Sequence, residues 1–128
     1  MIDFDLISRV SDDYWYDHEV MVVQDQLEQF SSGEWDALET QCRALAPAVQ
    51  ERIAYALGGV DCAASARILF RLCRSATRDT VLAAREALRG LDYRTVSEGA
   101  RSLSATADGA STNALLEWIS KAALPGGG

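Results

Sequence analysis

The chain has 128 residues, of which 48% are hydrophobic and 24% are charged, and its formal net charge is −7. These values are typical of one globular domain and exclude a collagen-like or wholly disordered chain. No apolar run approaches the roughly 18 residues that cross a bilayer, and the first residues lack the positive charge of a secretory signal. We therefore expect a cytoplasmic protein.

The charge is distributed unevenly along the chain. Residues 1–40 contain eleven acidic residues and one arginine, a balance of −10, whereas the remainder contains eight acidic and eleven basic residues, a balance of +3. An acidic surface repels nucleic acid and anionic membranes, and it attracts basic proteins with a salt-sensitive association rate. We expect a basic protein partner, no nucleic acid and no membrane.

Hydrophobic periodicity predicts a first amphipathic helix over residues 11–30, within an acidic amino-terminal segment that covers residues 1–30. The predicted core stripe of this helix consists of Tyr16, Val20, Val23, Leu27 and Phe30.

The second predicted helix begins at Ser31, which with Glu34 has the spacing of a capping box. Its predicted apolar face consists of Trp35, Leu38, Cys42 and Leu45. Pro47 would end this helix or begin the next one. The following helix would face the core with Val49, Ile53, Ala56 and Leu57, and the Gly58–Gly59 pair would stop it in the left-handed conformation.

Two further helices are predicted from capping residues and periodicity. Asp61 would cap a helix that runs to Arg74, and Asp79 would cap a helix that ends before Gly90. Their inward positions would be Ala64, Ile68, Leu69 and Leu72 in the first, and Val81, Ala84 and Leu88 in the second.

The carboxyl-terminal part has weaker signals. Residues 93–103 could form a helix despite Gly99, and Ser111 or Thr112 could cap a last one. Residues 92–124 would complete a single domain of residues 1–124, and the Pro-Gly-Gly-Gly sequence of residues 125–128 would be a flexible tail.

One sequence repeat suggests how these helices are arranged. The sequence Ala-Leu-Gly-Gly at residues 56–59 recurs as Ala-Leu-Arg-Gly at residues 87–90, 31 residues later. A period of about 30 residues with paired helices is typical of an α-solenoid. Residues 48–91 resemble HEAT-type repeats, through Arg-Ile-Ala-Tyr-Ala-Leu-Gly, Ala-Ala-Arg-Glu-Ala-Leu-Arg and the Ala-Ala-Ser-Ala-Arg-Ile-Leu helix between them. The resemblance implies an all-α fold: a short right-handed α-solenoid of about six to seven helices with HEAT-like hairpins over residues 31–91.

The sequence offers no converging catalytic set. His18 is the single histidine, and Cys42 and Cys73 fall on predicted apolar faces, where thiols are usually inert. The three cysteines, Cys42, Cys62 and Cys73, are separated by 20 and 11 residues, and these spacings match neither a disulfide framework nor a zinc motif. We therefore expect no catalytic residue and no enzyme activity.

Metal, phosphate and nucleic-acid sites are also not predicted. The acidic residues 12, 13 and 17 lack the glycine and ligand order of a calcium loop, and Gly58–Gly59 has no phosphate-loop lysine after it. Arg67, Arg71 and Arg74 share one helix face, for which pairing with nearby acidic residues is the favoured interpretation. We expect no metal and no cofactor.

The outer face of the first helix is the best candidate for binding a partner. Tyr14, Trp15, His18, Met21 and Val22 lie there among acidic residues, and aromatic and Met residues ringed by charge are typical of protein interfaces. The alternative is that Tyr14 or Trp15 packs beneath residues 4–6. The predicted partner-binding residues are Asp12, Asp13, Tyr14, Trp15, Asp17, Glu19, Met21, Asp25 and Glu28.

A short, acidic, HEAT-like chain of this kind is similar to immunity proteins of bacterial polymorphic toxin systems, of the contact-dependent inhibition or Rhs type. The similarity lies in the helix with Trp35 and Leu38 and in the helices with the sequences Arg-Ile-Ala-Tyr-Ala-Leu-Gly and Ala-Ala-Arg-Glu-Ala-Leu-Arg. It implies a cytoplasmic protein that blocks a cognate toxin C-terminal domain by tight binding. We expect that domain to be a basic nuclease, and we expect this chain to be a monomer or a weak dimer. The alternative is a HEAT-like adaptor with an endogenous partner.

Overall fold

The computed structural model describes residues 2–106 and 109–123, with side chains described as far as residue 120. Within these ranges the chain is all-helical and contains no strand, as the sequence predicted. None of the described helices is both long enough and apolar enough to cross a membrane. The predicted flexible tail, residues 125–128, lies outside the described residues, as does residue 124.

The helices follow one another with short connections. The amino-terminal part consists of α1 (Phe4–Arg9), α2 (Asp12–Tyr14), the π-helical turn η1 (Trp15–Glu19) and α3 (Val20–Glu28). The middle of the chain forms α4 (Ser32–Gln41), the 3-10 turn η2 (Cys42–Ala44), α5 (Pro47–Leu57), α6 (Ala63–Leu72) and α7 (Arg78–Gly90). The last two helices are α8 (Tyr93–Leu103) and α9 (Gly109–Ala123).

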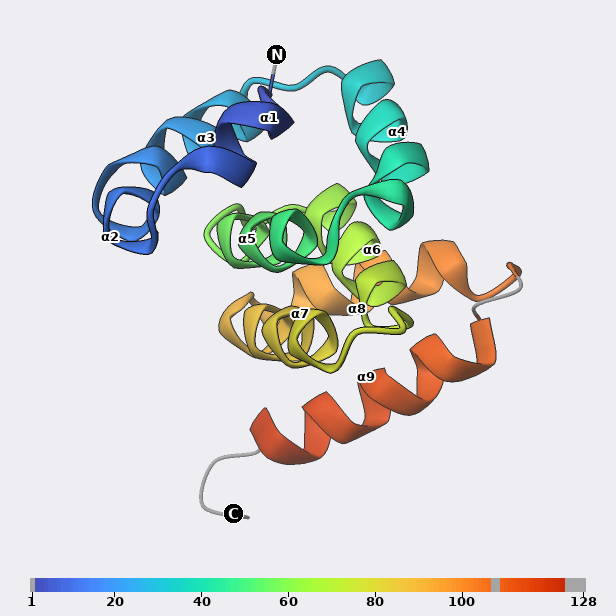
Figure 1. Ribbon diagram of the computed structural model, residues 1–128. Helices are drawn as coiled ribbons and strands as arrows, with labels where there is room; N and C mark the ends of the chain where they lie inside the picture. Colours follow the sequence, from blue (N-terminus) through green and yellow to red (C-terminus); the bar gives the residue numbers. More distant parts are fainter. Residues whose placement is uncertain (1, 107–108, 124–128) are drawn as a thin grey trace.

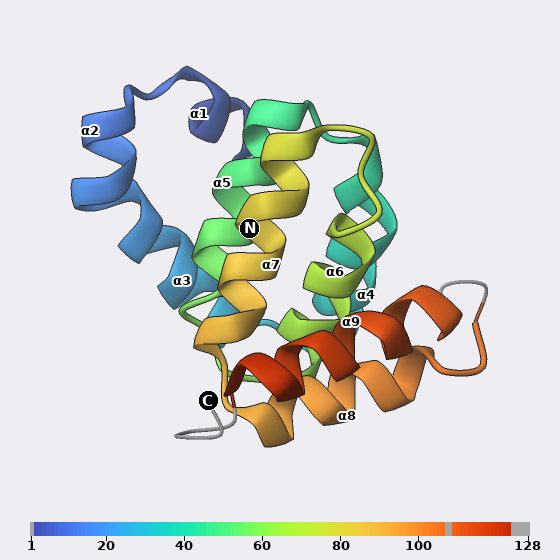
Figure 2. The same cartoon turned by 90° about the horizontal axis from the view of Figure 1, so that it is seen from below.

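Two rows of helices pack against each other. Helices α3, α5 and α7 form one row, and α4, α6 and α8 form the other, with the most extensive packing between α5 and α7 and between α6 and α8 (Figure 1). Helix α9 packs along α8 and also contacts α7, while α1 contacts α5 (Figure 2). The acidic amino-terminal helices thus lie at one end of the rows and α9 lies at the other.

The core lies between the rows and follows the predicted periodicity closely. All four predicted inward residues of α5 are buried, as are Ile68, Leu69 and Leu72 of α6. Burying each of the Val, Ile and Leu side chains among them stabilises the fold by about 1.5–3 kcal/mol. Ala64 and Val81 are partly buried, so they lie at the edge of the core.

The helix starts confirm one capping prediction and correct two. The Ser31 Oγ atom accepts from the Glu34 N–H at 3.3 Å, and the Glu34 carboxylate accepts from the Ser31 N–H at 3.1 Å, which completes the predicted capping box. Asp61 and Asp79 are not caps, because Cys62 precedes α6, Thr77 precedes α7, and neither side chain caps its helix. Asp79 lies in the first turn of α7, where its negative charge interacts favourably with the helix dipole.

Two other predicted boundaries also differ from the structure. Pro47 is the first residue of α5, so it begins this helix rather than ending the previous one. The last helix begins at Gly109, and Ser111 and Thr112 therefore lie inside it.

The predicted left-handed stop at Gly58–Gly59 is wrong. Gly58 has φ −63° and ψ −18°, a right-handed conformation, and Gly59 has no positive φ either. Gly58 is needed for a different reason, because a Cβ atom there would lie 3.0 Å from the Cβ atom of Ala87 on α7. The glycine allows α5 and α7 to approach each other closely.

Candidate partner-binding surface

The helix that runs from residue 12 to residue 28 contains a π-helical turn that decides which side chains face the core. The Val20 N–H donates to the Trp15 carbonyl, five residues earlier. Such a turn contains one more residue than an α-helical turn would, and it shifts the preceding side chains by one position. Trp15 is consequently fully buried, whereas Tyr16, the predicted core residue, is 46% exposed. Both predictions are corrected: Tyr16 is a surface residue, and Trp15 cannot contact a partner.

Glu19 is the second predicted contact residue that the structure removes from the surface. It lies one turn after Trp15 and is only 8% exposed, because the π-helical turn also rotates this position towards the protein interior. Of the nine predicted contact residues, Trp15 and Glu19 are therefore buried.

Arg52 on α5 holds this helix in place. Its Nη1 atom donates to the carbonyl oxygens of Ile7 at 2.7 Å and Val10 at 2.8 Å, at the end of α1. Its Nη2 atom donates to the Asp12 carboxylate at 2.8 Å, and its guanidinium lies 5.8 Å from the centroid of the Trp15 ring. Asp12, although exposed, thus helps to position the helix. Sequence reasoning missed Arg52 because its partners lie 40 to 45 residues earlier in the chain.

The other predicted contact residues lie together on the solvent side of this helix. We define the outer face by its exposed residues, which are Asp13, Tyr14, Asp17, His18, Met21, Val22, Asp25 and Glu28. Its apolar members are well exposed, with Tyr14 at 47%, Met21 at 54% and Val22 at 48%. The rings of Tyr14 and His18 lie 5.3 Å apart. The outer face therefore presents several apolar side chains at once.

The outer face is also strongly acidic. In the described part of the chain, Asp13, Asp17, Asp25 and Glu28 form no ion pair. A carboxylate without a neighbouring cation projects its field into solvent, where it attracts a basic surface. The outer face consequently combines apolar contact area with uncompensated negative charge.

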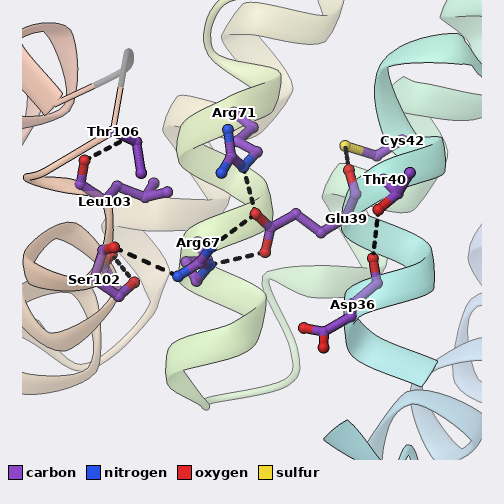
Figure 3. A network of polar contacts seen from close by, with 10 residues as sticks. Asp36, Glu39, Thr40, Cys42, Arg67, Arg71, Ser102, Leu103 and Thr106 are labelled. Atoms are coloured by element: carbon purple, nitrogen blue, oxygen red, sulfur yellow. Dashed lines mark hydrogen bonds and ion pairs between the residues drawn. The ribbon is translucent and has the colours of Figure 1, made fainter. Parts of the chain in front are cut away.

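The arginines of α6 are engaged within the protein. Glu39 on α4 accepts from Arg67 Nε at 2.8 Å and from Arg71 Nε at 2.5 Å, and Arg67 Nη1 also donates to the Ser102 carbonyl at 3.5 Å (Figure 3). The Arg67 hydrogen bond holds the pKa of Glu39 below its ordinary value, and Glu39 in turn raises the pKa of Arg67. The predicted pairing with a nearby acid is confirmed for Arg67 and Arg71, and the network joins α4, α6 and α8. Arg74, the third arginine of the prediction, donates to the Ser111 hydroxyl at 3.2 Å.

Two of the three cysteines, Cys42 and Cys73, lie where a thiol is hard to ionise. Cys42 is buried, and burial raises its pKa. Burial raises the pKa of Cys73 to about 12. Both inward placements agree with the sequence prediction.

Within residues 2–106 and 109–120, no group of three or more His, Cys, Asp or Glu side chains is arranged to hold a metal ion.

A groove on the α3, α5 and α7 row forms a second concave surface that the sequence did not predict. It has a volume of about 430 Å³ and is lined by Gln24, Tyr55, Gly58, Gly59, Ala83, Glu86, Ala87 and Gly90. At its edge the rings of Tyr16 and Tyr55 meet edge to face, with centroids 4.9 Å apart and an interplanar angle of 83°. Tyr55 is 51% exposed, so this pair is accessible from solvent.

Comparisons of the chain with protein families, with curated proteins and with solved structures gave no match.

Proposed function

We propose that the chain is a cytoplasmic immunity protein of a bacterial polymorphic toxin system. It binds a cognate toxin domain, a nuclease, through the outer face and blocks it by occlusion rather than by catalysis. As part of this proposal, the two helix rows form a short right-handed solenoid of HEAT-like pairs. The packing of α5 on α7 and of α6 on α8 supports this arrangement, because each pair covers the apolar face of the next.

One observation carries the proposal: the outer face combines four uncompensated carboxylates with Tyr14, Met21 and Val22, each about half exposed. A nuclease must hold a polyanion, so its substrate groove is basic. Carboxylates on a helix can take the place of phosphates in such a groove, and apolar side chains that fill pockets supply most of the binding energy.

The direct test is co-expression with the toxic C-terminal domain encoded beside the gene of this chain. The proposal predicts that growth is rescued and that the two proteins purify as a stable 1:1 complex. Replacement of Met21 by Glu should abolish rescue, because it places a charge among the apolar side chains without disturbing the core. Continued toxicity with the intact chain, at equal expression, would contradict the proposal.

A HEAT-like adaptor with an endogenous partner is the second candidate. It is favoured by the groove on the α3, α5 and α7 row, which shares no residue with the outer face and provides its own concave contact surface. The gene neighbourhood separates the two candidates: a toxin gene beside this one supports immunity, and the absence of one supports the adaptor.

A further inference from the structure

Two tyrosines at the edge of the groove form an exposed aromatic pair that the proposed function does not use. Tyr16 comes from the π-helical turn and Tyr55 from α5, and their edge-to-face contact fixes both rings relative to each other. Both rings are about half exposed. The negative face of an aromatic ring attracts cations within about 6 Å of its centroid.

The two helices that form the groove each carry a glutamate near this aromatic pair. Glu51 lies one helical turn before Tyr55 on α5, and Glu86 lines the groove from α7. Burial raises the pKa of Tyr16, the negative charges of Glu51 and Asp12 raise it further, and the Arg52 guanidinium lowers it. Among the described residues Glu51 has no ion-pair partner, while Glu86 is 78% exposed and pairs with Arg89 only at 3.7 Å.

The remaining groove residues leave room for one side chain of a partner. Ala83 and Gly90 of α7 have little or no side chain, and a Cβ atom at Gly90 would meet nothing within 4 Å, so the groove is open on this side. A volume of about 430 Å³ is enough for an extended arginine side chain with part of its backbone.

We propose that this groove binds an arginine side chain from a basic segment of a partner protein. The guanidinium would lie against the rings of Tyr16 and Tyr55, and the carboxylates of Glu51 and Glu86 would accept its N–H groups. Arginine fits better than lysine, because a planar, weakly hydrated guanidinium stacks on aromatic rings while it forms several hydrogen bonds. The groove shares no residue with the outer face. The proposed ligand is an arginine side chain, whether or not the partner that carries it is a toxin.

The test is a nuclear magnetic resonance titration of the full ¹⁵N-labelled chain with a blocked peptide, acetyl-Gly-Ser-Arg-Ser-Gly-amide. Saturable shifts are expected at residues 51, 55 and 83–90. A peptide with citrulline in place of arginine keeps the shape but lacks the charge, and it should bind at least about tenfold more weakly. The lysine peptide should bind about two- to fivefold more weakly than the arginine peptide.

Variants locate the site independently of the shifts. Tyr55→Ala and Glu51→Gln should each weaken binding of the arginine peptide about two- to fivefold. Tyr93→Ala removes a half-exposed tyrosine that lines neither the groove nor the outer face, so it serves as the matched control and should bind like the wild type. Glu51→Gln removes the negative charge but keeps the shape of the side chain. The test therefore remains valid if the Tyr55→Ala variant does not fold.

Three results would overturn this assignment: no saturable shifts, shifts confined to the outer face, or equal binding of the arginine and citrulline peptides. None of them would affect the proposed toxin contact, because that contact depends on the outer face. Conversely, failure of growth rescue would leave the arginine groove intact.

Discussion

At the residue scale, Trp15 contributes to stability. It is the largest of the fully buried side chains, and its ring lies beneath the Arg52 guanidinium. Its indole N–H has no hydrogen-bond partner among the described residues, which costs about 1–3 kcal/mol of stability. Burial of the ring and the contact with Arg52 offset that cost. Trp15 therefore links the amino-terminal helices to α5.

Replacing Trp15 with alanine tests this role. Trp15→Ala should lower the free energy of unfolding by about 3–5 kcal/mol, because it removes a fully buried ring. Urea denaturation followed by circular dichroism measures the change. Tyr14→Ala, next to it but 47% exposed, should change stability by less than about 1 kcal/mol. Equal effects of the two substitutions would contradict the burial of Trp15.

At the element scale, the Glu39 network joins three helices of one row. Glu39 lies on α4, its arginine partners lie on α6, and Arg67 reaches the Ser102 carbonyl on α8. Because the Arg67 hydrogen bond lowers the pKa of Glu39, the folded protein binds fewer protons at this site than the unfolded chain. The stabilisation is thus present above the ordinary glutamate pKa, and it is lost as the pH falls through the lowered folded value.

Glu39→Gln should therefore destabilise the protein in a pH-dependent way. We expect a loss of about 1–3 kcal/mol near neutral pH, where charge-assisted hydrogen bonds are broken. The difference between wild type and variant should shrink as the pH is lowered from about 7 to about 3. Urea denaturation across this range measures it. Glu86→Gln is the control, because it removes an exposed surface pair worth less than about 0.5 kcal/mol. A difference that does not change with pH would contradict the role of the charge.

Gly99 allows the close packing of α6 on α8. A Cβ atom at this position would lie 2.7 Å from the Cβ atom of Ala66 and 3.1 Å from the Arg67 nitrogen. Gly99→Ala should cost at least about 1 kcal/mol of stability, because overpacking outweighs the gain of about 1 kcal/mol in helix propensity. Gly90→Ala is the control, with nothing within 4 Å of the new atom, and it should be neutral or stabilising. Thermal unfolding compares the two, and a stable Gly99→Ala protein would contradict this packing.

The helices could be predicted well from the sequence because their signals are local. Apolar periodicity identified seven buried residues of α5 and α6 but missed others, including Phe70, and the Ser31–Glu34 spacing identified a capping box. The errors arose where tertiary packing decides the outcome. The glycines at 58 and 99 are required by neighbouring helices, not by their own backbone conformations, and that requirement is invisible in a local pattern.

The candidate surface was predicted less completely than the helices. Asp13, Tyr14, Asp17, Met21, Asp25 and Glu28 lie on the outer face as expected. A projection at 100° per residue misplaced Trp15, Tyr16 and Glu19, because it assumes α-helical spacing through what is a π-helical turn. The Tyr16–Tyr55 pair joins residues from two helices, and no single amphipathic pattern contains both.

At the scale of the whole molecule, the unpaired acidic residues and the paired arginines lie in different parts of the helix rows. The acidic helices lie at the end of the α3, α5 and α7 row, while the positive charges of Arg67 and Arg71 are held by Glu39 in the other row. Arg52 of α5 pairs with Asp12, but among the described residues Asp13, Asp17, Asp25 and Glu28 have no ion-pair partner, so the amino-terminal end still presents negative charge. This asymmetry supports a single, oriented contact with a basic partner.

The most direct test of this account is the dissociation constant for the toxin domain encoded beside the gene, measured with charge-reversal variants. Asp17→Lys combined with Asp25→Lys should weaken binding at least about 100-fold, since both acids lie on the outer face. Asp61→Lys combined with Glu98→Lys changes the net charge equally at exposed positions elsewhere, and it should weaken binding less than about threefold. Equal weakening by both pairs, or none by the first, would contradict the account.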